Sequence, residues 1–320
     1  MDAVIRTQGL TKYFGSKKVV DSLDLAIPAG AIWALLGDNG AGKSTTIRML
    51  TGQLPADGGR ATVLGRDCWK DAVEMRHQIG YVPEKPRFYD WMTAAEIGRF
   101  AAGFHRVGYA ERYSGLLDRF GLERGVKLSN MSKGGYARVG LALALASDPQ
   151  VLILDEPTSG LDLFTRREFL GSMIDLAAEG RTILISSHGI AEIERVASHV
   201  AFLAEGKLLL SGTLDDLRGR MVRVRLRHDG APPAPEGLGT VLEVRSDGKE
   251  WEAVVLDPDR VALADLHHRP GVMGVSESPL NLEEMYTSLL ARFHRGAKAS
   301  PTPLVAREPA LATADEGGGS

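Results

Sequence analysis

A chain of 320 residues is longer than one typical domain, so we expect a core of about 200 residues and an additional unit. Its 38 basic and 41 acidic residues nearly balance, which argues against nucleic acid as a partner. The single cysteine, Cys68, excludes an internal disulfide and fits a reducing cytosol. The first residues carry no signal-peptide pattern, and no apolar run approaches the roughly 20 residues that cross a bilayer. We therefore expect a cytoplasmic protein whose role at a membrane comes through a partner.

An alternation of apolar runs and helical patterns from residue 1 to about 218 predicts an α/β core. Within it, residues 31–36 are typical of a buried strand, and a helix is expected near Thr46. The segment between them fits G-x-x-x-x-G-K-[ST] at every fixed position. It reads Gly37-Asp38-Asn39-Gly40-Ala41-Gly42-Lys43-Ser44-Thr45.

Loops of this kind cradle nucleotide phosphates. Glycines allow successive backbone N–H groups to turn toward one anion, a geometry that side chains would obstruct. Lys43 is then expected to reach the β- and γ-phosphates of a nucleoside triphosphate, and the Ser44 hydroxyl to hold Mg²⁺. The helix that follows presents its positive N-terminal end to the phosphates. A chance glycine-rich turn is the alternative, and the strand–loop–helix setting argues against it.

Residues from about 86 to 148 are mostly helical and predict an insert between two strands of the sheet. A capping box at Thr93 and Glu96 begins one helix, and two more are expected at 110–120 and 134–147. The last follows Ser132-Lys133-Gly134-Gly135. A hydroxyl and two flexible residues at a helix N-terminus form a second anion site, which makes sense for a nucleotide held by another subunit. The alternative is a simple serine N-cap.

Two later strands end in polar residues. Residues 151–154 lead into Asp155, expected to hold Mg²⁺ opposite Ser44, and Glu156, expected to orient or deprotonate the water that attacks the γ-phosphate. The alternative is an ordinary acidic pair. A crossover helix is expected at 164–179, followed by a strand that ends in Ser186, Ser187 and His188. His188 is expected to hydrogen-bond the γ-phosphate, although most histidines at strand ends are only partly buried polar residues.

A smaller α+β domain is predicted at residues 219–295. Its first strand alternates valine and leucine with Arg223, Arg225 and Arg227, and this arginine stripe is either a solvated face or a contact for acidic lipid or a partner. Asn281, with Glu284 three residues on, is expected to cap a final helix. Residues 296–320 are rich in small residues and proline and are expected to be disordered.

Together the motifs resemble the ATP-binding subunits of ABC transporters over about residues 1–218. In chain order they are Tyr13, the phosphate loop, residues 79–84, 132–135, 154–158 and 159–162, and finally Ser187 and His188. The resemblance implies a P-loop NTPase cassette, with a RecA-like core and a helical insert. It also implies two cassettes packed head to tail, each ATP lying between one phosphate loop and the partner's residues 132–135. In that arrangement Tyr13 stacks on adenine, Asp162 lies at the dimer seam and His188 is the switch residue.

Two positions depart from the usual family pattern. Glu84 stands where glutamine is usual, and the usual Leu-Ser-Gly-Gly-Gln segment is replaced by residues 131–136, in which Ser132, Gly134 and Gly135 remain. A carboxylate at position 84 still approaches Mg²⁺ or water, so we retain Glu84 as a catalytic and metal-site candidate. Both departures are similar to cassettes of the ABC-2 exporter group, and so is the ending at 278–286.

The resemblance implies the ATP-hydrolysing subunit of an exporter, peripheral on the inner face of the cell membrane. Its partners would be an integral membrane permease, which docks near residues 84–105, and a second cassette, as a homodimer or heterodimer. A cytosolic ABC ATPase of DNA repair, translation or cofactor assembly is one alternative, and the charge balance argues against it. An importer ATPase and a non-enzymatic nucleotide-gated scaffold are the others. The cargo would be chosen by the membrane subunit.

Overall fold

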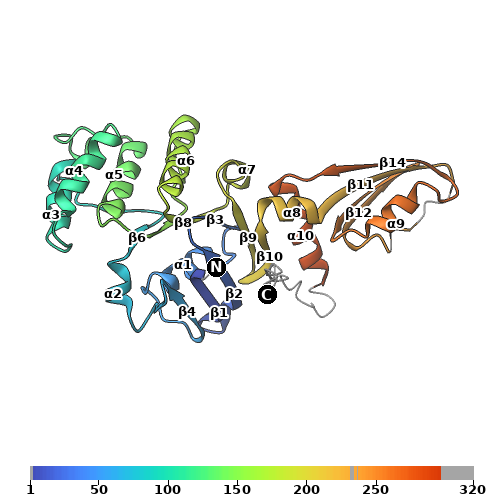
Figure 1. Cartoon of the computed structure of the whole chain (residues 1–320), viewed down its shortest axis with the longest axis horizontal. Helices are drawn as coiled ribbons and strands as arrows, with labels where there is room; N and C mark the ends of the chain where they lie inside the picture. The colour runs from blue at the N-terminus through green and yellow to red at the C-terminus, as the bar shows by residue number, and fades with distance from the viewer. Residues whose placement is uncertain (1–2, 231–233, 236, 297–320) are drawn as a thin grey trace, which may run out of the picture.

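The computed structural model describes residues 3–230, 234–235 and 237–296. Figure 1 shows three parts along the long axis of the molecule: a helical part at one end, a sheet-rich centre, and a second sheet at the other end. Most of the tail expected to be disordered, residues 297–320, lies outside the described residues, and Gly296 ends the last helix. None of the helices in the described part of the chain is both long and apolar enough to cross a membrane.

A six-stranded sheet forms the centre, in the order β10-β9-β3-β8-β7-β6. Strands β6, β7, β8, β3 and β9 run parallel, and β10 pairs antiparallel with β9. All residues of β3 and β7 are buried, as expected for strands covered on both faces. This arrangement confirms the predicted α/β core. The strands are β3 (Ile32–Leu36), β6 (Ile79–Val82), β7 (Val151–Asp155), β8 (Thr182–Ser187), β9 (His199–Ala204) and β10 (Lys207–Thr213).

A second, antiparallel sheet combines two strands that precede the first helix of the chain with two strands that follow it, and the sequence patterns did not predict it. Its order is β2-β1-β4-β5. Helix α1 (Lys43–Leu50) follows β3 directly and buries Ile47 and Leu50 in a cluster with residues of both sheets. The remaining elements of this part are β1 (Ala3–Phe14), β2 (Lys17–Pro28), β4 (Gly58–Val63), β5 (Arg66–Asp67) and α2 (Ala72–Arg76).

The helical insert lies between β6 and β7 in the chain and has a hydrophobic cluster of its own. The predicted capping box is present, because Thr93 Oγ1 accepts from Glu96 N–H while the Glu96 carboxylate accepts from Thr93 N–H. Helices α6 and α7 follow later and pack on the central sheet. The helices are α3 (Ala94–Ala102), α4 (Tyr109–Arg119), η1 (Leu128–Asn130), α5 (Lys133–Leu145), α6 (Leu163–Ala178) and α7 (Ile190–Ile193).

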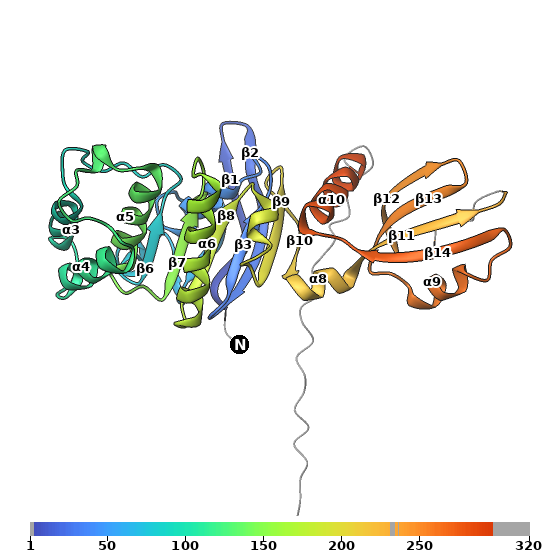
Figure 2. The same cartoon turned by 90° about the horizontal axis from the view of Figure 1, so that it is seen from above.

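The C-terminal part is a four-stranded antiparallel sheet in the order β12-β13-β11-β14. Helix α9 packs on one of its faces, and α10 turns back toward the central sheet (Figure 2). The capping box expected of α10 is present, with Asn281 and Glu284 each accepting from the other's backbone N–H. The elements are α8 (Leu214–Arg220), β11 (Met221–His228), β12 (Thr240–Asp247), β13 (Glu250–Leu256), α9 (Arg260–Leu266), β14 (Val272–Pro279) and α10 (Leu282–Gly296).

The arginine stripe of β11 forms ion pairs within the chain. Arg223 contacts both Glu252 (3.1 Å) and Glu284 (2.7 Å), and Arg225 contacts Glu252 at 2.6 Å. Arg227 pairs with a further glutamate of β13. The stripe was interpreted from sequence as a solvated face or as a contact for acidic lipid or a partner. Neither interpretation included these carboxylates, because they lie on a neighbouring strand and on α10 and are distant in sequence.

Candidate nucleotide site

The phosphate loop connects β3 to α1 and is tightly held. Gly42 takes a left-handed conformation (φ 102°), and a Cβ there would lie 2.8 Å from the carbonyl oxygen of Val19. Gly37 is equally confined, because a Cβ would lie 2.4 Å from Leu203 O. Gly42 is also the N-cap of α1 and supplies no side chain to cap it. The first N–H groups of α1 therefore remain available to an anion.

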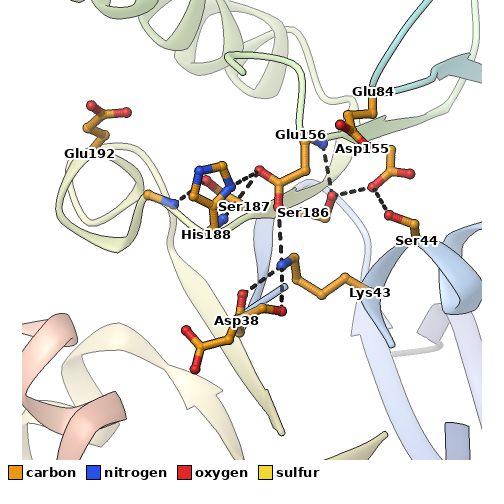
Figure 3. A network of polar contacts seen from close by, with 12 residues as sticks. Asp38, Lys43, Ser44, Glu84, Asp155, Glu156, Ser186, Ser187, His188 and Glu192 are labelled. Atoms are coloured by element: carbon orange, nitrogen blue, oxygen red, sulfur yellow. Dashed lines mark hydrogen bonds and ion pairs between the residues drawn. The ribbon is translucent and has the colours of Figure 1, made fainter. Parts of the chain in front are cut away.

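Lys43 points back into the loop and is almost fully buried, with 5% of its surface exposed. Its ammonium donates to Gly37 O at 2.6 Å and to Asp38 O at 3.3 Å. It also lies 3.1 Å from Glu156 Oε1. These three oxygens compensate the buried charge and fix the ammonium at the mouth of the loop (Figure 3).

Asp155 ends β7 and is held by two hydroxyl groups. Ser44 Oγ donates to Asp155 Oδ1 at 3.0 Å, and Ser186 Oγ donates to the same oxygen at 2.7 Å. Burial raises the pKa of the Asp155 carboxyl, against the effect of these two hydrogen bonds. A buried carboxylate beside a hydroxyl is the kind of oxygen pair that a hard divalent cation takes as ligands.

Glu156 joins the two sides of the site. Its backbone is left-handed (φ 47°), a strained conformation for a glutamate, and its N–H donates to Ser186 Oγ at 2.9 Å. One carboxylate oxygen contacts Lys43, and the other lies 2.8 Å from His188 Nδ1 and accepts from His188 N–H at 3.3 Å. The Glu156 carboxylate is thus oriented by two cationic or polar partners, while the His188 ring is half exposed.

Residues of the phosphate loop, together with Glu156 and His188, line one pocket of about 410 Å³. Most of the residues predicted for the phosphate site are part of it, and Asp155 lies behind it through Ser44. Three features of the site were not predicted from sequence: Val19, Ser159 and the hydrogen-bonding role of Ser186. The position of Ser186 at the same strand end as His188 is the sequence signal for its role. The lining is Val19, Asp38, Asn39, Gly40, Gly42, Lys43, Ser44, Thr45, Glu84, Glu156, Ser159 and His188.

The other predicted residues lie outside this lining. Ser132 caps α5, its hydroxyl accepting from Gly135 N–H at 3.1 Å, and Asp162 caps α6. A Cβ on Gly134 would lie 2.3 Å from a methyl of Thr165, so the two helix starts are packed against each other. Ser132 thus has the geometry of a simple serine N-cap, the alternative to an anion site, and it lies on an exposed surface.

Tyr13 lies elsewhere, near the end of β1 on the antiparallel sheet. The residue is 42% exposed, and the Lys18 ammonium lies 5.5 Å from the centre of its ring. An exposed aromatic face of this kind is suited to stacking against a planar base.

Comparison with known proteins identifies the family. A family model described as ABC transporter matches residues 20–159. The bacitracin transport ATP-binding protein BcrA of Bacillus licheniformis is 39% identical over 226 residues, which are 69% of this chain and 73% of that protein. The chain belongs to the ATP-binding subunits of ABC transporters. The daunorubicin/doxorubicin resistance ATP-binding protein DrrA of Streptomyces peucetius is 33% identical over 304 residues, which are 89% of this subunit and 92% of that protein.

Other matches agree on the cassette and differ in length. An uncharacterized ABC transporter ATP-binding protein of Synechocystis is 38% identical over 218 residues, 65% of the subunit, and the match spans 61% of that protein. A solved ATP-binding subunit of an ABC transporter has a TM-score of 0.61 and 31% identity, covering 68% of this chain and 92% of that one. The subunit is thus an ATP-binding P-loop cassette of a family whose activity is ATP hydrolysis, and the predicted fold class and enzyme class are confirmed.

Proposed function

We propose that the chain is the ATPase subunit of an ABC exporter and drives a separate membrane permease. The observation that carries this proposal is the position of Glu156, whose carboxylate lies between Lys43 and His188 at the edge of the phosphate pocket. A carboxylate in this position is suited to act on a water molecule that attacks the terminal phosphate.

Each group in the pocket then has a distinct task. Lys43 and the N–H groups of the loop neutralise and orient the phosphates, which is where most of the catalysis of phosphoryl transfer lies. Glu156 orients the water and accepts its proton. His188 contacts Glu156 and would hydrogen-bond the γ-phosphate. Its backbone N–H holds the Glu156 carboxylate in place.

The residues present also fit a magnesium ion. Ser44 and Asp155 offer a hydroxyl and a carboxylate 3.0 Å apart, and burial disfavours the charged form of Asp155, a cost that a bound cation would offset. Glu84 lies beside Asp155 in Figure 3 and has an exposed carboxylate, so it remains a candidate for an outer ligand in place of the usual glutamine. Bound there, Mg²⁺ would supply charge neutralisation at the β- and γ-phosphates.

A second cassette would complete the site. The segment that contains Ser132, Gly134 and Gly135 offers a helix N-terminus to an anion, yet it does not line the pocket of its own chain. Asp162 lies next to it, because the starts of α5 and α6 pack together. In a head-to-tail dimer these segments would face the ATP held by the partner's phosphate loop, while Tyr13 stacks on the adenine.

The docking surface for the permease would be a groove of about 620 Å³ on the helical insert. An exposed aromatic cluster lies at this groove, with Phe100 5.4 Å from both Tyr89 and Phe104 and with Trp91 beside Tyr89. Exposed apolar patches of this kind favour a protein partner. Residues 83–86 connect the groove to the nucleotide pocket, since Pro83 and Pro86 line the groove and Glu84 lines the pocket.

The direction of transport is inferred from relatives. Bacitracin transport, daunorubicin and doxorubicin resistance, and Nod factor export are the roles named for proteins that match the chain. By analogy, this subunit would serve an exporter and would be attached to the inner face of the cell membrane through its permease. The permease would select the transported substrate.

Co-expression with the permease gene nearest to its own reading frame tests this proposal. The complex should be isolated in detergent, and its Mg²⁺-dependent ATPase should be lost in Lys43→Ala. The proposal would be overturned if the chain were isolated with ribosomes or DNA and without a membrane protein, or if the purified complex hydrolysed no ATP with Glu156 intact.

A further inference from the structure

A tyrosine of the last helix reaches the phosphate loop. Tyr286 lies on α10, 248 positions after Asp38 in the chain. Its hydroxyl oxygen accepts a hydrogen bond from Asp38 N–H at 3.0 Å. Asp38 is the second residue of the glycine-rich loop, so a side chain from the C-terminal part contacts the backbone that binds phosphate.

This hydrogen bond acts on the same peptide unit that Lys43 contacts. The Gly37 carbonyl accepts from the Lys43 ammonium at 2.6 Å, and the N–H of the same planar unit, on Asp38, donates to Tyr286. Because a peptide unit is rigid and planar, fixing its N–H also fixes the direction of its C=O. The hydroxyl of Tyr286 therefore helps to set where the Lys43 ammonium lies.

The tyrosine is itself firmly placed. Its ring is buried and stacks on Phe202 of β9 with 5.8 Å between ring centres. Phe202 is the strand neighbour of Leu36, the last residue before the loop. Burial raises the pKa of Tyr286 to about 12, so its hydroxyl stays neutral at physiological pH.

Helix α10 also holds the C-terminal sheet. Glu284, two residues before Tyr286, pairs with Arg223 of β11 at 2.7 Å, and Arg292 donates to Val241 O of β12 at 2.8 Å. The buried apolar side chains of α10, including Met285, belong to the hydrophobic cluster of the central sheet. One helix thus contacts the C-terminal sheet, the central sheet and the phosphate loop.

We propose that Tyr286 is a positioning residue for ATP binding, which makes the C-terminal part a component of the nucleotide site. Its hydroxyl orients the peptide unit between Gly37 and Asp38, and through it the Lys43 ammonium. The inference rests on the proposed role of Lys43 in holding the phosphates.

The test compares two tyrosines in the full chain. Tyr286→Phe removes the hydroxyl and keeps the ring on Phe202. Tyr113→Phe is the matched control, because the Tyr113 hydroxyl is also buried and donates to a backbone oxygen, Ala94 O, at 2.9 Å, but in the helical insert. We expect Tyr286→Phe to raise the Kd and KM for ATP about three- to tenfold, the effect of losing the hydrogen bond from Asp38 N–H, with kcat within about twofold of the parent.

Hydrogen exchange provides a readout that does not depend on activity. The amide hydrogen of Asp38 should exchange faster in Tyr286→Phe than in the parent, and at the parent's rate in Tyr113→Phe. Without nucleotide, both variants should lose a similar amount of thermal stability. Equal ATP affinity and equal Asp38 protection in the two variants would overturn the inference. Lys43→Ala distinguishes a failure of the proposed function from a failure of this inference. If Lys43→Ala binds ATP as the parent does, the proposed function fails. If Tyr286→Phe matches its control, only the role of Tyr286 is contradicted.

Discussion

The ammonium of Lys43 lies 3.1 Å from Glu156 Oε1, and both side chains are buried. The cation proposed to hold the phosphates and the carboxylate proposed to act on water are therefore partners of each other. Phosphate oxygens that reach Lys43 compete with Glu156 for the same ammonium. Binding of ATP would release Glu156 from this pair, and nucleotide binding would in this way prepare the base.

Replacement of Glu156 by glutamine separates these two roles. Glu156→Gln removes the base, so we expect ATP turnover to fall about 10²- to 10⁴-fold. It also removes the anion that competes for Lys43, so ATP affinity should be retained or increased. Phosphate release, equilibrium nucleotide binding and light scattering would check this, with an ATP-bound dimer accumulating. Glu168→Gln, at an exposed pair with Arg138, is the control, and full turnover in Glu156→Gln would contradict the assignment.

Lys43→Ala, in contrast to Glu156→Gln, should weaken the binding of ATP. Hydrogen bonds to charged groups contribute about 1.5–3 kcal/mol, so ATP affinity is expected to fall about 10- to 100-fold. Glu156 is then left with His188 as its nearest ionisable partner. Titration with a fluorescent ATP analogue measures the change, and Lys70→Ala, on an exposed turn, should bind as the parent does. An unchanged affinity in Lys43→Ala would show that the phosphates bind elsewhere.

The phosphate site could be predicted from sequence because its parts are local. A glycine-rich loop between a buried strand and a helix, and polar residues at the ends of two parallel strands, must meet at one edge of the sheet. The pocket confirms that Lys43, Ser44, Glu156 and His188 are close together. The alternation of Val222, Val224 and Leu226 likewise predicted β11 correctly.

What the sequence did not reveal depends on contacts between distant residues. The hydrogen bond from Asp38 to Tyr286 spans 248 positions, and no periodic pattern encodes it. The ion pairs of Arg223 depend on the register of β11 against β13 and on the return of α10. The antiparallel strand β2 carries an alternating apolar pattern at Leu23, Leu25 and Ile27. Its pairing with β1 contains several register shifts, which the pattern does not encode.

The aromatic cluster on the helical insert gives a prediction about assembly. Phe104 is 69% exposed and stacks edge-on against Phe100, so Phe104→Asp places a charge in the proposed docking groove without opening the core. We expect the variant to bind ATP with the affinity of the parent but to be recovered with much less permease from detergent extracts. Val261→Asp, at an 80% exposed position of α9, is the control. Undiminished recovery with Phe104→Asp would place the permease on another surface.

The attachment of α10 to the C-terminal sheet should depend on pH. Arg223, and then the backbone N–H of Asn281, hold the pKa of Glu284 below its usual value of 4.5. The folded state therefore favours the carboxylate, and the stability this contributes is present above pH 4.5 and lost as the pH falls through the lowered pKa. Because Glu284 is partly exposed, Glu284→Gln should cost at most about 1 kcal/mol at pH 7.

Urea unfolding of Glu284→Gln and its parent at pH 7, 5, 4 and 3 would measure this cost. We expect the difference in unfolding free energy between Glu284→Gln and its parent to have its full value at pH 7 and to approach zero at pH 3. Glu283→Gln, one position earlier on the same exposed turn, controls for loss of a negative charge near the start of α10. A deficit that stayed constant over the whole range would mean that the carboxylate of Glu284 acts by packing and not through its charge, and that α10 is held to the sheet by other contacts such as Arg292.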